Sequence, residues 1–263
     1  MGWIGILQRR NKIMKINGIK THTITKKDTD ITKVISKYVT RLEEKSILII
    51  TSKIVSICEG NMVSTSSTDK DTLIQNEAEY YIPRTKSHYN VCLTINNGIL
   101  APSAGIDESN ADGNYILWPK DSQKSANSIR EFITNYYKVQ HAGVLIIDSK
   151  TTPLRWGTTG IALSWSGFLP LKDYIGAPDL FGRIMKMTNQ SLIDGLASAA
   201  NLVMGEGNEA TPIAIAQDLS FIEFVDRNPT QEEINNLMIN PKDDLYEPIL
   251  SHAPWKKRVD TKL

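Results

Sequence analysis

The sequence has few of the residues that mark disulfide-rich or nucleic-acid-binding proteins. Its two cysteines, Cys58 and Cys92, each lie in an apolar, strand-like segment, so neither a disulfide framework nor a cysteine-based zinc site is supported. Its 30 basic and 29 acidic residues give a formal net charge of +1, which is no electrostatic reason to expect nucleic acid. We therefore expect a reduced, cytoplasmic protein that binds no nucleic acid.

Long hydrophobic runs are also absent, so no segment is expected to span a membrane. The apolar run within Met1–Arg10 is too short for a secretory signal, and its positive charges follow it rather than precede it. Either Met1 or Met14 is the native start. Of the four histidines, His22 and His141 lie near segments of interest, but neither has a second histidine at metal-ligand spacing.

What is present is ordinary globular composition. With 263 residues, 41% of them hydrophobic, the chain is long enough for one large domain or two intimately packed ones. Apolar periodicity alternates between helical and strand spacing, which predicts an α+β fold with mixed sheets. The main expected elements are a helix near 31–39 capped by Asp28 or Asp30, buried strands at 47–50, 143–147 and 161–165, and helices at 125–137 and 188–203.

The C-terminal part is more polar. Residues 226–263 contain four prolines that interrupt any long element, which predicts a peripheral extension after a main domain at 14–225. Within it, Thr230-Gln-Glu-Glu matches a capping box and predicts a short helix through Met238.

Three acidic segments suggest a site. Asp107 lies in a polar turn at 104–110, Asp148 and Ser149 end the strand at 143–147, and Glu206 follows a helix of small residues. Magnesium and manganese take oxygen ligands and bridge phosphates, so this set fits a metal–phosphate site. Singly, however, such aspartates cap turns more often than they bind metal. Glu206 either follows the helix cap at Gly205 or lines a phosphate loop.

In their order, these segments resemble the coenzyme F420-0:γ-glutamyl ligase family over most of the chain. Further support comes from the stretches at 47–56, 173–183 and 201–207. The stretches at 224–233 and 244–250 look like those of a folate-associated γ-glutamate ligase subgroup. The resemblance implies two interlocked subdomains, a homodimer with the active site near its interface, and ATP- or GTP-dependent joining of L-glutamate to folate, which is favoured, or to F420-0. An acyl phosphate would be the intermediate.

The resemblance also implies residue roles. The metal ligands for Mg²⁺ or Mn²⁺ are Asp107, Asp148, Ser149, where the family usually has threonine, and Glu206. The nucleotide-contacting residues are Thr21, His22, Thr23, Ile24, Ser52, Lys53, Asn110, Met204, Gly205, Gly207, Asn208 and Glu209. Arg155 is assigned a catalytic role, binding a phosphate or the glutamate carboxylate, against the alternative of an exposed arginine.

Two departures from the family pattern touch charge. Ile57 stands where the family has a nucleotide-contacting lysine, and Lys53 is expected to share its face by strand alternation. Thr151-Thr152 replaces a Gly-Arg pair, which bears on the acceptor. These losses leave open an alternative function, a catalytically inactive nucleotide- or metal-binding sensor or scaffold.

Overall fold

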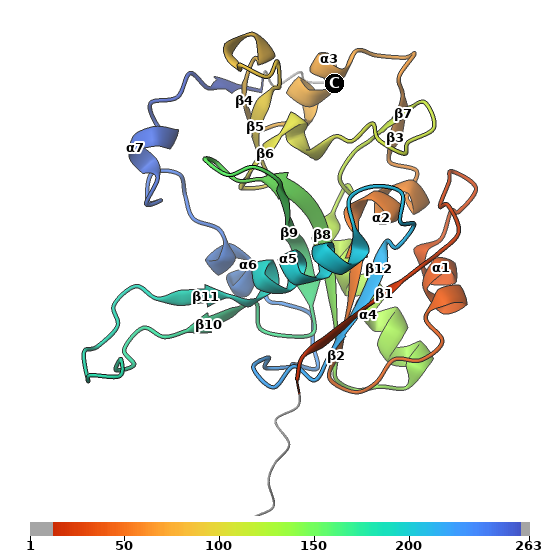
Figure 1. The fold of residues 1–263 in the computed structure, drawn as a ribbon, viewed down its shortest axis with the longest axis vertical. Coiled ribbons are helices and arrows are strands. Elements are labelled where there is room, and N and C mark those ends of the chain that lie inside the picture. Colours follow the sequence, from red (N-terminus) through yellow and green to blue (C-terminus); the bar gives the residue numbers. More distant parts are fainter. Residues whose placement is uncertain (1–12, 259–263) are drawn as a thin grey trace, which may run out of the picture.

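The computed structural model describes residues 13–258, and a five-stranded mixed sheet lies at its centre (Figure 1). Its strand order is β1-β12-β2-β8-β9, in which only β2 and β8 are parallel neighbours. The strands are β1 (Lys15–Ile19), β12 (Ile213–Gln217), β2 (Ser46–Thr51), β8 (Ala142–Thr151) and β9 (Thr158–Ser166). Mixed strand directions together with separate helices confirm the predicted α+β class.

Alternation along β2 divides the interior into two cores. Leu48 and Ile50 point to one face of the sheet, and Ile47 and Ile49 to the other, all four fully buried. The first face is covered by α1 (Ile31–Tyr38), α2 (Ser52–Cys58) and α4 (Ser122–Tyr137), and the second by α5 (Leu192–Met204). A sheet with two buried faces explains why the sequence shows continuous apolar runs at these strands.

The helix α5 packs unusually close to the sheet. A Cβ placed on Gly160 of β9 would lie 2.2 Å from the carbonyl oxygen of Ala197 in α5. Only glycine permits this approach, which sets the height of α5 over the sheet and hence the position of the loop that follows it.

A second, four-stranded sheet has its own core and lies above the first in Figure 1. Its order is β13-β4-β5-β6, and α3 (Lys70–Glu77) covers it. The strands are β13 (Lys256–Lys257), β4 (Tyr80–Ile82), β5 (Leu93–Asn96) and β6 (Ile99–Pro102), with the short 3-10 helices η1 (Arg84–Lys86) and η2 (Ser103–Gly105). Beside it, β3 (Met62–Ser64) pairs with β7 (Asn114–Ile116). The chain leaves the central sheet after α2 and returns to it at α4, so β4, β5 and β6 of the second sheet belong to a segment inserted between these two helices.

The segment after β12 contacts both sheets. The capping box predicted at Thr230 is present at the start of α6 (Gln231–Leu237). The side chains of Ile234 and Leu237 in α6 pack against the core between the central sheet and α5. Beyond α7 (Glu247–Leu250), β13 pairs with β4. The boundary between residues 225 and 226 stays a prediction.

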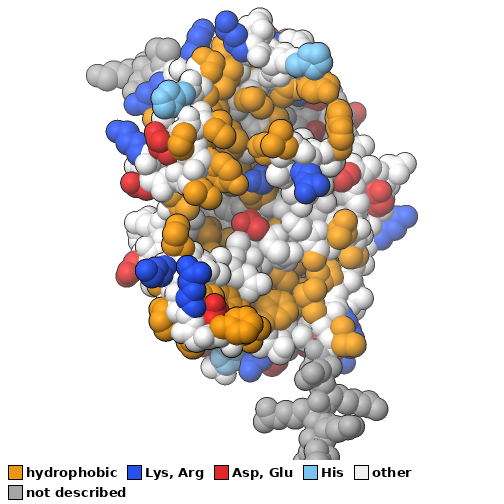
Figure 2. Space-filling model, turned by 60° about the vertical axis from the view of Figure 1, so that its left-hand side comes forward, with side chains coloured by type: hydrophobic (Ala, Val, Ile, Leu, Met, Phe, Trp, Pro, Cys, Tyr) orange, Lys and Arg blue, Asp and Glu red, His pale blue; other side chains and the backbone are white. Residues whose placement is uncertain are grey.

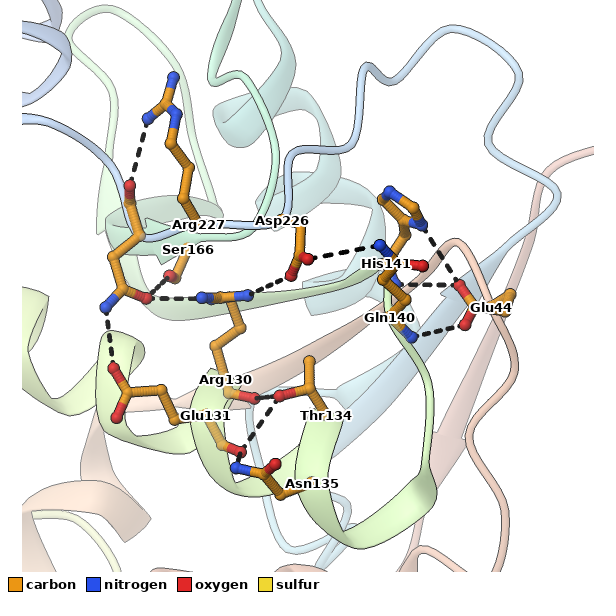
Figure 3. A network of polar contacts seen from close by, with 11 residues as sticks. Glu44, Arg130, Glu131, Thr134, Asn135, Gln140, His141, Ser166, Asp226 and Arg227 are labelled. Atoms are coloured by element: carbon orange, nitrogen blue, oxygen red, sulfur yellow. Dashed lines mark hydrogen bonds and ion pairs between the residues drawn. The ribbon is translucent and has the colours of Figure 1, made fainter.

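A polar network anchors the start of this segment to α4 (Figure 3). The buried Arg130 donates from Nε to Asn228 Oδ1 at 2.9 Å and lies 3.7 Å from a carboxylate oxygen of Asp226. Asp226 also accepts from Gln140, and Asn228 Oδ1 accepts from Ser166. Burial of a guanidinium requires such partners, so these contacts fix where the segment crosses α4.

A hairpin-like arm extends from the body of the molecule (Figure 1). Its base is the pairing of β10 (Leu171–Asp173) with β11 (Asn189–Ser191). The exposed large hydrophobic residues between them are Ile175, Leu180, Phe181, Ile184 and Met187.

Several predicted elements are confirmed, and three are wrong in detail. Of the two predicted caps, Asp28 and Asp30, it is Asp30 that caps α1. Residues 52–58, interpreted as continuing a strand, form the helix α2. The helix predicted from residue 188 begins at Leu192, because 189–191 pair as a strand, and the strand predicted to end at Asp148 and Ser149 continues to Thr151. Cys58 and Cys92 are buried and unpaired. No helix in residues 13–258 is long and apolar enough to cross a membrane, and the predictions on Met1–Arg10 fall outside these residues.

Candidate active site

A cleft lies at the end of β2, beside Asp148 and Ser149 of the longer strand β8. Because adjacent parallel strands run in one direction, Thr51 and Asp148 come to the same edge of the sheet, and the chain segments that follow them surround that edge. The cleft encloses about 1150 Å³, its open mouth included. Among its lining residues are Thr21, His22, Thr23, Ile24, Lys53, Ile57, Asp107, Ser109, Asn110, Asp148, Ser149, Asn201, Met204, Gly205, Glu206, Gly207, Asn208 and Glu209.

Asp107 is held on one wall by a cation and a tight turn. Lys53 Nζ lies 2.5 Å from Asp107 Oδ2 and also donates to the carbonyl oxygen of Ser109 at 3.2 Å. The Ser109 amide donates to Asp107 Oδ1 at 2.7 Å, closing an Asx turn. Although burial raises the pKa of Asp107, the Lys53 ammonium and these hydrogen bonds outweigh it and hold the pKa below its ordinary value. Asp107 is therefore ionised at neutral pH.

Asp148 has the opposite electrostatic character. The residue is half-buried, and the desolvation of its carboxylate raises its pKa to about 6, with a smaller contribution from the nearby charge of Asp107. The indole nitrogen of Trp118 and the amide of Ser149 donate to it, and Lys53 lowers the pKa in part. Two carboxylates with pKa values moved apart at one strand edge form an environment that a further cation would stabilise.

Glu206 lies on the opposite wall, in the loop after α5. Gly205 caps the helix at a φ of +81°, a conformation that favours glycine, as predicted for this position. Asn201 Nδ2 donates to Glu206 Oε1 at 2.7 Å, and the Gly207 amide donates to Glu209 Oε2 at 2.8 Å. The loop thus lines the cleft with the carboxylates of Glu206 and Glu209, each held by a hydrogen bond from a nearby residue.

Long-range hydrogen bonds join the walls. Asn110 Nδ2 donates to the carbonyl oxygen of Gly207 at 3.1 Å, and the Thr21 amide donates to that of Ala210 at 2.8 Å. His22 bonds Tyr38 and Asp28 on its far side, so its ring is oriented by two partners. The structure thereby brings the predicted stretches at 21–24, 107–110 and 204–209 into one cleft.

Lys53 and Ile57 share a face for a different reason than predicted. They lie in helix α2, where a spacing of four residues places them on one side, and both line the cleft. The prediction that these residues alternate along a strand was wrong, because they lie in a helix. The prediction that they share a face is confirmed, and Lys53 presents a cation beside the apolar side chain of Ile57.

Two predicted residues lie outside the cleft lining. Ser52 is buried at the start of α2, and Arg155 is exposed at the tip between β8 and β9. Their proposed roles remain predictions. Three residues not singled out from the sequence support the acids: Ser109, Trp118 and Asn201. The Asp-x-Ser turn had a local signal, whereas Trp118 is 30 residues from its partner and had none.

The oxygen atoms that line the cleft are of the kind that a hard divalent cation binds. No three or more histidine, cysteine, aspartate or glutamate side chains among the described residues are grouped to hold a metal ion by themselves. The cleft does place Asp107, Asp148, Glu206 and the Ser149 hydroxyl around one space, all oxygen donors. Magnesium and manganese commonly combine a few protein carboxylates with water and substrate phosphates, so these residues fit such an ion.

Comparison with known proteins finds matches to one kind of enzyme. A family model described as F420-0:Gamma-glutamyl ligase matches residues 18–218. A "Coenzyme F420:L-glutamate ligase" of Methanopyrus kandleri is 35% identical over 196 residues, which covers 68% of this chain and 77% of the relative. Proteins of the same name from Methanococcus maripaludis and Methanocaldococcus jannaschii are each 32% identical, covering 78% and 71% of this chain and 88% and 80% of those relatives.

Proposed function

This chain belongs to the F420-0:γ-glutamyl ligase family, and from that premise we propose that it joins L-glutamate to an acid acceptor at the expense of a nucleoside triphosphate. The observation that supports this proposal most is the cleft at the end of β2 and beside Asp148 of β8, where two carboxylates, a lysine and a glycine-containing loop converge. Amide formation in water needs an activated carboxylate, and these groups are suited to binding a triphosphate beside it.

In the proposed reaction, the acceptor carboxylate attacks the γ-phosphorus and the nucleoside diphosphate leaves, giving an acyl phosphate. The glutamate amine then attacks the acyl carbon, and phosphate departs with the proton balance met by loss of an ammonium proton. Lys53 and the amides of the 204–209 loop hold phosphate oxygens, while the walls orient the two substrates. No side chain of the protein needs to form a covalent bond.

The proposed cofactor is Mg²⁺ or Mn²⁺, held by Asp107, Asp148, Ser149 and Glu206. When bound, it would neutralise charge on the phosphate oxygens. GTP or ATP is the proposed co-substrate, and its contacts would be the residues predicted from the sequence, with Ser52 contributing through α2. Lys53 and Asp107 pair with each other on one wall of the cleft. On binding of the nucleotide, Lys53 would contact a phosphate and Asp107 the metal ion instead.

Folate monoglutamate is the favoured acceptor and F420-0 the alternative. The names of the relatives support F420-0. The folate-like stretches at 224–233 and 244–250 lie beyond residue 218, where the family match ends, and they support folate. Either product carries a γ-linked glutamate, so the cleft chemistry is common to both.

We also propose a homodimer in the cytoplasm. The arm between β10 and β11 exposes hydrophobic side chains away from the body, which supports its burial against a second copy. Unpaired Cys58 and Cys92 support a reducing location.

The test is mass spectrometry of products formed from GTP or ATP, Mg²⁺ or Mn²⁺, L-glutamate, and monoglutamyl tetrahydrofolate or F420-0. A gain of one glutamate on either acceptor supports the ligase and identifies its acceptor. Nucleotide binding without turnover on either acceptor contradicts it and favours the sensor or scaffold, for which apolar Ile57 in the cleft is the supporting observation.

A further inference from the structure

Two aromatic residues distant in sequence meet on an exposed surface. Tyr89, in the loop between β4 and β5, and Trp156, at the β8–β9 tip, have ring centroids 6.2 Å apart at an interplanar angle of 78°. Their exposed fractions are 68% and 92%, and Leu154 beside them is fully exposed. The edge-to-face contact fixes the angle of the rings, yet most of their apolar surface faces solvent.

The tip between β8 and β9 has an unusually apolar sequence for a loop. A tip between two strands is usually polar, whereas this one contains Pro153, Leu154 and Trp156. Leu154 has a φ of +62°, a left-handed conformation that costs a leucine about 1 kcal/mol. Both features are unfavourable for the isolated protein, and both present apolar side chains outward.

The tip is continuous with the candidate active site. Asp148 lies on β8, which leads directly into the tip, and the three residue steps from Asp148 to Thr151, the last residue of β8, carry the chain about 10 Å away at the usual rise of a strand. A molecule with its reacting carboxylate beside Asp148 and its other end near Trp156 must therefore be extended. The hydrogen-bonded β8–β9 ribbon holds the two ends at a fixed separation.

The two chain segments that carry the pair are basic. Residues 80–106 and 149–171, which carry the two aromatics, contain no aspartate or glutamate. They contain the exposed Lys86 and Arg155 and the half-buried Lys150, while Arg84 is already paired with Asp71. Figure 2 shows basic and hydrophobic side chains close together over the upper part of this side, above a hollow. Exposed aromatic faces suit stacking against a planar ring, and nearby cations suit an anionic group attached to that ring.

We propose that Tyr89 and Trp156 form the subsite for the aromatic end of the acceptor, a planar heteroaromatic acid whose reacting carboxylate reaches the cleft. This inference rests on the proposed ligase function, because that function supplies the acid acceptor. Pteridine and deazaflavin acceptors share this chemistry, a fused ring at one end and an acidic group at the other. The ring packs against Trp156, and Lys150 and Arg155 face its anionic tail.

The experiment compares Trp156→Ala, Tyr89→Ala and Trp156→Phe with wild type. Equilibrium dialysis measures binding of monoglutamyl tetrahydrofolate and of F420-0 to each full-length protein, and steady-state kinetics measure the KM of each substrate. We expect the alanine variants to bind the acceptor about 10-fold or more weakly and to show a KM for the acceptor that is higher by a similar factor. Affinity for nucleotide and the KM for glutamate remain unchanged, and Trp156→Phe restores most of the loss.

Tyr136→Ala is the matched control, since Tyr136 is also exposed, at 55%, but lies on α4 at the other end of the molecule (Figure 1). Acceptor affinity within twofold of wild type in both alanine variants overturns the subsite. An equal loss of acceptor and nucleotide affinity in variants that circular dichroism shows to be folded overturns it as well.

The two proposals fail separately. Wild-type turnover combined with unaffected alanine variants contradicts only the subsite. Acceptor binding that depends on Trp156, without any glutamylated product, contradicts only the ligase. A wild-type protein that binds neither acceptor contradicts both.

Discussion

Lys53 contacts Asp107 and the Ser109 carbonyl group, so a single ammonium organises one wall of the cleft. Its charge also lowers the pKa of both Asp107 and Asp148. With Ile57 apolar on the same helical face, Lys53 is the cation that α2 presents to the cleft. At the scale of the residue, the site therefore depends on this side chain as much as on the acids.

Lys53→Met is expected to weaken nucleotide binding by about 10-fold or more, because a charge-assisted phosphate contact is lost. Lys53→Arg, which keeps the charge, is expected to retain most of the affinity. Isothermal titration with GTP and ATP measures both. Equal affinity in wild type and Lys53→Met would exclude a phosphate contact at this residue.

Asp148→Asn is expected to abolish turnover and to stabilise the metal-free protein. A folded-state pKa of about 6, above the ordinary 3.8, means that the folded protein prefers protonated Asp148. Wild-type stability therefore falls as pH rises from about 4 to about 6, and the asparagine variant lacks this loss. The difference should reach at most about 3 kcal/mol above pH 7.

Urea unfolding with chelator at pH 4 and pH 7.5 measures this difference. Asp107→Asn is the matched control, since the pKa of Asp107 is lowered and its loss should give no such gain with rising pH. Retained turnover in both variants would contradict the assignment of these aspartates as metal ligands. An Asp148→Asn protein no more stable than wild type at pH 7.5 would contradict the raised pKa of Asp148.

At the scale of the element, α5 positions Glu206 because its last turn leads directly into the 204–209 loop and carries Asn201. Its height over the sheet depends on Gly160, where a Cβ would meet the Ala197 carbonyl group. Packing of one helix on one strand thus controls a wall of the cleft.

Gly160→Ala is expected to destabilise the protein by about 2 kcal/mol or more and to reduce activity, because α5 must move outward. Gly195 is the control within the same helix: it is exposed, and a Cβ there meets nothing within 4 Å. Gly195→Ala should instead stabilise by about 0.5–1 kcal/mol. Thermal unfolding of both variants is the measurement, and equal effects would contradict the packing account.

At the scale of the whole molecule, the arm at 171–191 and the segment after β12 have contrasting relations to the body. The latter is fixed by Arg130, α6 and β13, whereas the arm exposes Leu180 and Phe181 at 98% and 95% (Figures 1 and 3). Such exposure is costly for a monomer in water. Burial of the arm against a second copy would remove this cost.

Replacing Leu180 and Phe181 together by aspartate is expected to convert the proposed dimer to a monomer, because two charges would be buried in the interface. Analytical ultracentrifugation measures the change. The paired substitution Lys242→Ala and Asp243→Ala, in an exposed polar loop, is the control. A wild-type monomer at micromolar concentration would contradict the dimer.

Local signals in the sequence determined much of this protein. Continuous β-branched runs gave the buried strands, Asp30 and Thr230 gave helix starts, and Gly205 gave a helix end, because each depends on residues within a few positions. The order of the segments around Asp107, Asp148 and Glu206 also indicated the family and where the cleft would lie.

Tertiary structure alone decided the rest. Residues 52–58 are rich in β-branched residues and almost wholly buried, so their periodicity did not distinguish helix from strand, and packing selected the helix. The Trp118–Asp148 bond and the Tyr89–Trp156 pair join residues 30 and 67 positions apart. Such contacts arise from the path of the chain between two sheets, a long-range property that spacing in one sequence does not contain.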